Sequence, residues 1–161
     1  MYCSSSFPTN ERSPGGTSGN SGSLTKQLEP LFEKYGVDVY IGAHIHAYER
    51  TYPVTGNGTE TDCDCVNAVS DEEDVYTNPA GVVNLNLGMS GANHLDETWS
   101  GVDWSARHFE EYGYARLQVI NGTCFKVEFV ANGGEEGAGD GPIVRDTLWV
   151  VKDAKYVKDA K

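Results

Sequence analysis

The clearest pattern of apolar positions in this chain is helical and lies in residues 24–35. The apolar residues recur at intervals of three and four, as on one face of a helix: Leu24, Leu28, Leu31, Phe32 and Tyr35. Ser23 can cap the start of this helix, and Gly36 can end it in a left-handed conformation. Pro30 removes one backbone hydrogen bond, so we expect the helix to kink there or to begin its more regular half there.

Short runs rich in β-branched and aromatic residues follow the helix. We predict strands at residues 37–41, 81–87, 112–120, 125–130 and 147–151. The first run directly follows the helix stop, which is typical of a buried strand in an α/β unit. Two later runs alternate apolar and polar residues on either side of Asn121-Gly122, a turn signal that predicts a β-hairpin.

Segments without any period separate these elements. Residues 4–23 are rich in Ser, Gly, Pro, Thr and Asn, which predicts a loop. Residues 55–79 include the run Asp71-Glu72-Glu73-Asp74 and predict a long acidic surface insertion. We expect an exposed turn at residues 132–141. Residues 154–161 belong to two short copies of Val-Lys-Asp-Ala-Lys and are interpreted as a tail.

The composition suits one soluble domain. The chain has 161 residues, of which 39% are hydrophobic, and this is enough to bury a core. Its 24 acidic and 12 basic residues give a net charge of −12, which repels polyanions. We therefore expect neither nucleic acid nor a membrane as a partner. No apolar run approaches the ~20 residues that span a bilayer, and the first residues do not resemble a signal peptide.

Cysteines and sequons bear on the compartment. Cys3, Cys63, Cys65 and Cys124 match no tetrahedral zinc pattern, and disulfides remain open. Two Asn-X-Thr sequons begin at Asn57 and Asn121, both in glycine-marked turns where an attached glycan would reach solvent. We predict both asparagines as glycosylation sites, which favours a secreted, vacuolar or lysosomal protein.

A His-X-His segment carries the candidate chemistry. His44 and His46 follow a predicted strand, and residues i and i+2 of an extended chain share one face. Two imidazoles at the carboxyl end of a strand can bind one metal or a metal pair, and paired metals cleave phosphoesters. By spacing alone, structural or surface histidines are the commoner interpretation. We expect Tyr48 to pack, and Glu49 and Arg50 to form an ion pair that braces the loop.

The longer string around the histidines is more specific. GAHIHAYERTYPV, residues 42–54, closely resembles a motif of the purple acid phosphatases, which are calcineurin-like metallophosphoesterases. Five other segments resemble pieces of that family in the family's order: MYCSSS, LEPLFEKYGVDVYI, VVNLNLGMSGANHLDETW, YGYARLQVINGT and RDTLWVVKD. We therefore interpret residues 1–153 as the C-terminal part of such a catalytic domain.

The resemblance implies a fold, an activity and two site residues. The fold would be α/β: the C-terminal half of a metallophosphoesterase-type β-sandwich flanked by helices, and incomplete. The family hydrolyses phosphate monoesters at acidic pH with a dinuclear centre of Fe(III) and Zn, Mn or Fe(II). By position, His44 would bind the divalent ion and His46 the ferric ion. Ala43 replaces the family's usual glycine, which would crowd the loop if another backbone approaches closely.

The departures from the family limit what this chain does alone. The family's other ligands are an upstream Asp, Asp, Tyr and Asn, and a His just before the MYCSSS piece. None is in this chain, so two ligands would hold the metals weakly. No catalytic residue is assigned, because residues 4–8 lack the proton-donating histidine of some plant members. His94 and His108 can lie near the rim, although such histidines are more often simply solvated.

Three interpretations of the function follow. The first is a fragment of an acid phosphatase. The second is a truncated inactive relative that serves as a secreted binding or structural glycoprotein. The third is a phosphoesterase with nucleotide or inositol phosphate substrates, a choice that pocket loops decide. The sequence does not predict an oligomeric state.

Overall fold

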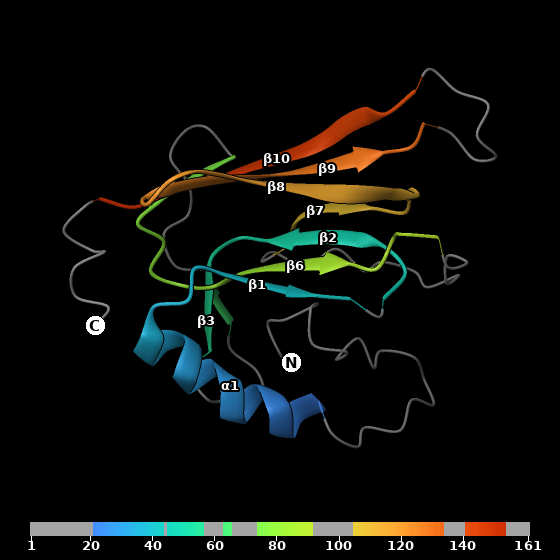
Figure 1. The fold of residues 1–161 in the computed structure, drawn as a ribbon. Helices are drawn as coiled ribbons and strands as arrows, with labels where there is room; N and C mark the ends of the chain where they lie inside the picture. Colours follow the sequence, from blue (N-terminus) through green and yellow to red (C-terminus); the bar gives the residue numbers. More distant parts are fainter. Residues whose placement is uncertain are drawn as a thin grey trace.

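The computed structural model describes residues 21–43, 45–56, 63–65, 74–91, 105–133 and 141–153. These residues form two stacked four-stranded β-sheets, a small two-stranded sheet and a helix. Helix α1 lies on the side of the first sheet that faces away from the second sheet (Figure 1). This layered arrangement agrees with the predicted β-sandwich.

The first sheet has the strand order β1-β6-β2-β7. Its strands are β1 (Val39–Gly42), β6 (Val83–Leu87), β2 (Tyr48–Thr51) and β7 (Ser105–Phe109). Strands β1 and β6 are parallel, whereas β2 is antiparallel to both β6 and β7. The parallel pair contains two of the predicted strands, and both are confirmed.

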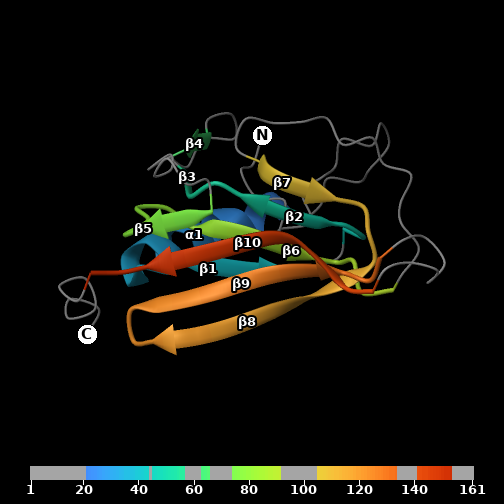
Figure 2. The same cartoon turned by 90° about the horizontal axis from the view of Figure 1, so that it is seen from above.

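The second sheet has the strand order β5-β10-β9-β8. Its strands are β5 (Val75–Thr77), β10 (Ile143–Val151), β9 (Cys124–Ala131) and β8 (Gly113–Asn121). Strands β8 and β9 form the predicted hairpin, and β5 pairs with β10 in parallel. Seen from above, β8 is an outer strand of this sheet (Figure 2).

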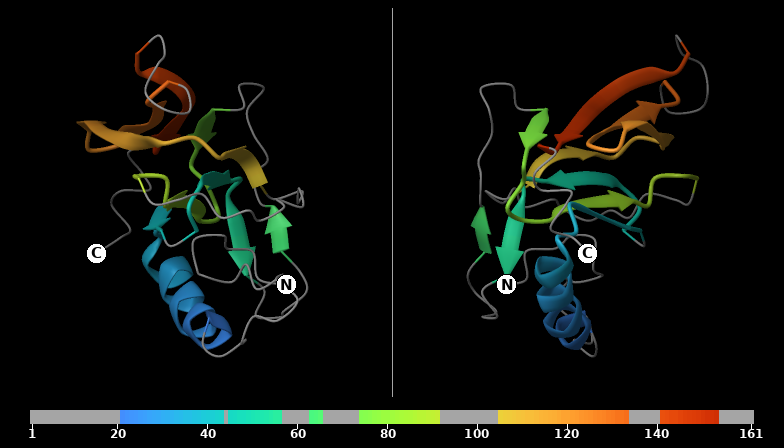
Figure 3. Two further views of the ribbon diagram at one scale, coloured as in Figure 1. Left: turned by 90° about the vertical axis from the view of Figure 1, so that its right-hand side faces the viewer. Right: turned by 60° about the vertical axis from the view of Figure 1, so that its left-hand side comes forward.

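Helix α1 (Ser21–Tyr35) ends as its sequence predicts. Gly36 has a φ of +60°, and Val37 N donates to Phe32 O at 2.9 Å, which closes the last turn. The views in Figure 3 show α1 and β10 on opposite sides of the first sheet. The start differs from the prediction, because the helix already begins at Ser21; Ser23 is inside it and is not the cap. Residues 4–20 of the predicted loop lie outside the described residues.

The hydrophobic core lies between the two sheets. Its larger cluster joins strands of both sheets: Tyr76, Val83, Leu85, Val127, Leu148 and Val150. In the smaller cluster the ring of Tyr48 on β2 stacks on that of Phe129 on β9, with centroids 4.5 Å apart. Tyr48 therefore packs in the core, as expected.

Five strands were not expected from the sequence. Strands β2, β3 (Val54–Gly56) and β7 were missed, and so were β4 (Cys63–Cys65) and β5, which fall in the predicted insertion at residues 55–79. Strand β4 pairs with β3, and β5 adds to the second sheet. The idea of a structureless insertion is wrong for these parts, because pairing with distant strands stabilises segments with no period of their own. The acidic run 71–73 and the tail 154–161 lie outside the described residues.

Candidate functional site

The segment 43–47 is a loop that crosses the end of one strand to join its two neighbours. Strand β6 lies between β1 and β2, with Asn86 paired to Gly42 on one side and to Glu49 on the other. The chain leaves β1 at its carboxyl end, passes over the end of β6 and returns as β2. The parallel pair β1 and β6 thus places this loop at the carboxyl edge of the sheet, where α/β folds form their ligand sites.

His46 lies in this loop and is half-buried. Residues 45–47 form a bend rather than an extended strand. The argument that alternate residues of an extended chain share a face therefore does not apply here, and this premise was wrong. His44 lies outside the described residues. That His44 and His46 bind metals stays a prediction, carried by the motif and not by strand geometry.

The side chain of Asn86, at the end of β6, is hydrogen-bonded to the backbone of the loop. Its Nδ2 donates to Ile45 O at 2.9 Å and to Ala47 O at 2.7 Å, the two carbonyls that flank His46. The amide is buried, with 1% of Asn86 exposed, and its Oδ1 receives no hydrogen bond. Asn86 therefore fixes the loop backbone on both sides of the histidine.

Gly88 lets the loop sit against the strand end. Its N–H donates to Ala47 O at 3.2 Å. A Cβ at this position would lie 1.7 Å from Ile45 O, a distance that no side chain tolerates. Close backbone approach therefore occurs at Gly88. The side chain of Ala43 is exposed, and crowding by this residue stays a prediction.

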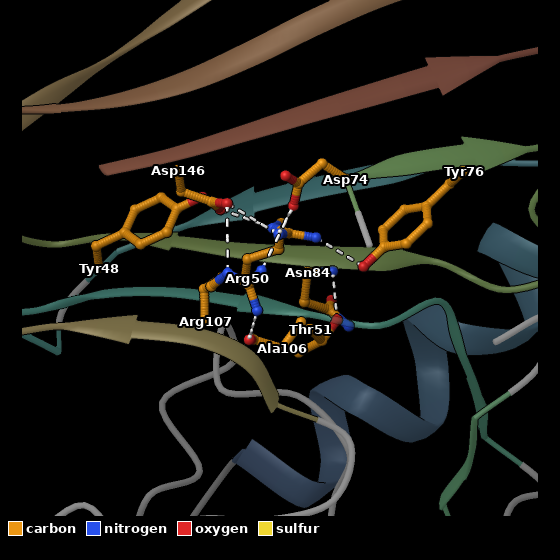
Figure 4. Close-up of polar contacts among 9 residues, drawn as sticks. All are labelled: Tyr48, Arg50, Thr51, Asp74, Tyr76, Asn84, Ala106, Arg107 and Asp146. Carbon is orange, nitrogen blue, oxygen red and sulfur yellow. Dashed lines mark hydrogen bonds and ion pairs between the residues drawn. The ribbon is translucent and has the colours of Figure 1, made fainter. Parts of the chain in front are cut away.

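Strand β2 connects the loop to a buried polar network between the sheets (Figure 4). Arg50 forms a bidentate pair with Asp146 on β10, at 2.6 Å from Nε and 2.8 Å from Nη2. Its Nη2 also meets Asp74 at 3.1 Å, and its Nη1 donates to the Tyr76 hydroxyl at 2.7 Å. The Tyr48 hydroxyl donates to Asp146 at 2.6 Å. Thus one charged cluster ties both sheets together.

The predicted ion pair between Glu49 and Arg50 is wrong. Adjacent residues of a strand point to opposite faces, so these two side chains cannot meet on β2. Arg50 points between the sheets, whereas Glu49 accepts a hydrogen bond of 2.6 Å from Ser105 Oγ on β7. Arg50 therefore does not brace the loop. It anchors β2, the strand that follows the loop.

Burial and charge shift the pKa values in this network. Burial, with the nearby Asp146 charge, raises the pKa of the Tyr48 hydroxyl far above its usual range. Burial likewise raises the pKa of Tyr76 to about 12. For Arg50 burial acts to lower the pKa, but the hydrogen bond and charge of Asp146 outweigh it and raise the pKa. The tyrosines stay neutral donors or acceptors, and Arg50 stays charged.

The other predicted site residues are spread over the molecule. His108 lies on β7 with Nε2 3.4 Å from Glu110 Oε1, and His94 is outside the described residues. Asn121 is exposed at the end of β8, and its Oδ1 accepts hydrogen bonds from the N–H and the hydroxyl of Thr123. Asn57 lies outside the described residues. Cys124 is a free thiol.

One described residue of the loop, His46, is of a type that binds metals. Within the described residues, no three His, Cys, Asp or Glu side chains are grouped to bind an ion. The fit to a metal rests on the imidazole of His46, a donor that suits iron and zinc, in a loop whose backbone is clamped by Asn86. The described helix is neither long nor apolar enough to cross a membrane.

Asn86 and Gly88 were not singled out from the sequence. The signal was present in Val83-Asn84-Leu85-Asn86, where polar asparagines alternate with apolar residues in a buried strand. Alternation puts the asparagines on the face opposite to the core. Such a buried amide must find partners, and for Asn86 the partners are the loop carbonyls.

Comparisons with known proteins relate this chain to the purple acid phosphatases. The family described as Iron/zinc purple acid phosphatase-like protein C matches residues 81–146. Acid phosphatase type 7 of Mus musculus is 37% identical over 131 residues, which are 78% of this chain and 26% of the mouse protein. Probable inactive purple acid phosphatase 1 of Arabidopsis thaliana is 28% identical over 133 residues, 82% of this chain and 19% of that protein.

A solved structure has the same fold over most of the chain. It is the purple acid phosphatase PPD1 from yellow lupin (Lupinus luteus) seeds, with a TM-score of 0.65 and 24% sequence identity. The match covers 81% of this chain and 20% of the lupin chain. The chain therefore spans about a quarter or less of the length of these relatives.

Proposed function

The chain belongs to the purple acid phosphatase family, as part of its C-terminal portion, and from this premise we propose that it supplies the His-X-His loop to a dinuclear metal centre. The activity proposed for the whole protein is hydrolysis of phosphate monoesters at acidic pH. The observation that carries this proposal is the clamped loop around His46 at the carboxyl edge of β1 and β6.

His44 and His46 have the role of metal ligands in this proposal. His44 holds the divalent ion, which is Zn, Mn or Fe(II), and His46 holds Fe(III). When bound, such a pair of ions supplies a hydroxide nucleophile at low pH and clamps the phosphoryl oxygens. The residues of this chain present the imidazoles, and the hydrogen bonds of Asn86 hold the backbone on both sides of His46.

The remaining ligands and the proton donor come from outside this chain. Two imidazoles leave most of the five or six positions of each ion unfilled, so the chain alone binds the metals weakly. We therefore place the activity in a longer polypeptide. The mass of the native protein tests this step: an immunoblot against residues 24–50 should give a band several times heavier than 17.5 kDa. A band near 17.5 kDa would mean that the native protein lacks the other metal ligands, and the proposed catalysis would then fail.

Activity is tested on the same native protein. The purified protein should hydrolyse a chromogenic phosphate monoester below neutral pH, and a chelator should abolish this hydrolysis. Replacing His46 by Ala should abolish it as well. A native protein that binds two metals but leaves phosphate monoesters intact would contradict the proposed substrate class while keeping the metal site.

An inactive relative is the second candidate function. The Arabidopsis thaliana relative, whose printed name calls it probably inactive, aligns with most of this chain. In this alternative the fold persists as a binding or structural glycoprotein without a complete metal centre. Metal analysis separates the two, because the active enzyme retains two ions per chain after dialysis, whereas the inactive relative retains fewer than two.

Glycosylation at Asn57 and Asn121 belongs to the same proposal, with a secreted, vacuolar or lysosomal location. Asn121 is exposed in the hairpin turn, beside Val119, of which 68% is exposed. A glycan there would shield apolar surface. Digestion with a glycosidase should increase the mobility of the native protein, and Asn57→Gln and Asn121→Gln should each remove part of that change. A protein whose mobility does not respond to the glycosidase would contradict both sites.

A further inference from the structure

We propose that Asn86 is a positioning residue for His46. Its amide group sets the backbone of the loop that carries the imidazole, and through this backbone it sets the direction of the ring. The proposal rests on the proposed function, because the position of His46 matters only if His46 binds a metal. It assigns no contact between Asn86 and the metal.

The contacts of Asn86 are directed at the loop on both sides of the histidine. The Nδ2 bonds measure 2.9 Å to Ile45 O and 2.7 Å to Ala47 O, and the second one is buried. A third bond closes the loop on itself, since Ala47 N donates to Ile45 O at 2.8 Å. The two carbonyls next to His46 thus turn inward, which leaves the peptide units of the loop little freedom to rotate.

Packing alone does not explain an asparagine at this position. The Oδ1 of Asn86 is buried and receives no hydrogen bond, an arrangement that lowers the stability of a fold. An apolar residue of similar volume would avoid that loss. The feature that such a residue cannot supply is the Nδ2 donor, and both of its hydrogens are used on the loop.

Gly88 supports the same assignment independently. It lies two residues beyond Asn86, and the absence of its side chain lets Ile45 O come down onto the strand end. Its N–H then reaches Ala47 O. Asn86 on β6 and Gly88 just beyond β6 therefore both act on the carbonyls of Ile45 and Ala47, which is expected if this end of the strand positions the loop.

Asn84 provides a matched control. It is the same residue type on the same strand, it is also buried, and alternation puts it on the same face. It pairs with Tyr40 in the middle of β1, whereas Asn86 pairs with Gly42 at the end of β1. Asn84→Ala therefore removes a buried amide from the same sheet at a greater distance from the loop.

The experiment compares Asn86→Ala and Asn84→Ala in the full native polypeptide. Hydrogen exchange of the metal-free protein should be faster in the peptide that spans residues 43–48 for Asn86→Ala, and unchanged there for Asn84→Ala. Fe(III), the ion that this proposal assigns to His46, should bind at least about tenfold more weakly to metal-free Asn86→Ala than to metal-free wild type. Equal affinity and equal exchange for the two variants would overturn the proposal.

A measurement on the wild type tests the proposal even if the Asn86→Ala variant does not fold. The side-chain amide protons of Asn86, observed by NMR in the metal-free protein, should exchange slowly because both are donated to loop carbonyls. Rapid exchange would overturn the proposal. If wild type binds no Fe(III), the proposed function fails by itself, while the exchange measurements still decide whether Asn86 holds the loop.

Discussion

The motif of residues 43–51 divides into two regions that differ in environment and in role. Residues 45–47 form a bend at an edge of the first sheet, and His46 in it is only half-buried. Residues 48–51 form strand β2, which is buried along its whole length. The comparison shows that one continuous motif combines a presenting loop with an anchoring strand.

The two regions are also held by different forces. The loop receives neutral hydrogen bonds from Asn86 and Gly88 at the end of β6. Strand β2 is held by a charge-assisted pair across the sandwich, Arg50 with Asp146, and by the stacking of Tyr48 on Phe129. Changes in the strand should therefore alter the stability of the whole domain, whereas changes in the loop should alter metal binding with smaller effects on stability.

The largest effect is expected at Asp146. Asp146→Ala leaves the fully buried Arg50 without its main counter-charge, which should lower the free energy of unfolding by about 3–5 kcal/mol. Denaturant titration measures this change. The control is its neighbour on β10, Arg145, which pairs with Glu111 at the surface at 2.8 Å. Arg145→Ala should change stability by about 1 kcal/mol or less; a similar loss in both variants would contradict the anchoring role.

Alkaline pH should weaken the strand region next. The pKa of Tyr76 is raised from 10.0 to about 12, so the unfolded chain releases this proton before the folded protein does. Stability from this group is therefore complete below about pH 10 and is lost as pH rises from 10 to 12, by on the order of 2 kcal/mol. Denaturation midpoints between pH 8 and 12 test this. Tyr76→Phe should show a shallower decline, and an unchanged decline would contradict it.

A smaller effect is expected where the loop meets β6. Gly88→Ala places a methyl group against Ile45 O and should lower stability by about 1–3 kcal/mol, because the loop must move. Zinc affinity should fall in the same variant. Gly122→Ala is the control, since a Cβ there meets nothing within 4 Å. If Gly88→Ala binds zinc as wild type does, the close approach of Gly88 to Ile45 O is not needed for the loop geometry.

The smallest effect on stability is expected at His46. His46→Ala changes a half-buried side chain in the loop and should alter the unfolding free energy by less than about 1 kcal/mol. Thermal unfolding of the metal-free protein measures it. A loss as large as that of Asp146→Ala would show that His46 is part of the structural core, and the division between loop and strand would fail.

The sequence predicted those elements whose own pattern is periodic. Helix α1 with its Gly36 stop, strand β1 and the β8–β9 hairpin all carry local signals, and all are confirmed. Strands β2, β5 and β7 are three to five residues long and are formed by pairing with distant segments, which local patterns do not reveal.

The candidate site followed the same rule. The motif identified His46, and the structure added its supports. The partners of Arg50 lie 96 and 24 residues further along the chain, so no local pattern indicates them. The wrong pairing of Glu49 with Arg50 came from treating β2 as a loop. Once the segment is a strand, alternation separates the two side chains.

The central claim is that this chain presents His46 to a metal centre, and metal analysis of the native protein tests it most directly. Wild type and His46→Ala would be purified without chelators, dialysed and analysed for iron, zinc and manganese per chain. The account predicts two ions per chain in wild type and a loss of iron in His46→Ala with the fold intact. A wild-type protein that retains no metal, or a variant that retains all of it, would contradict the claim.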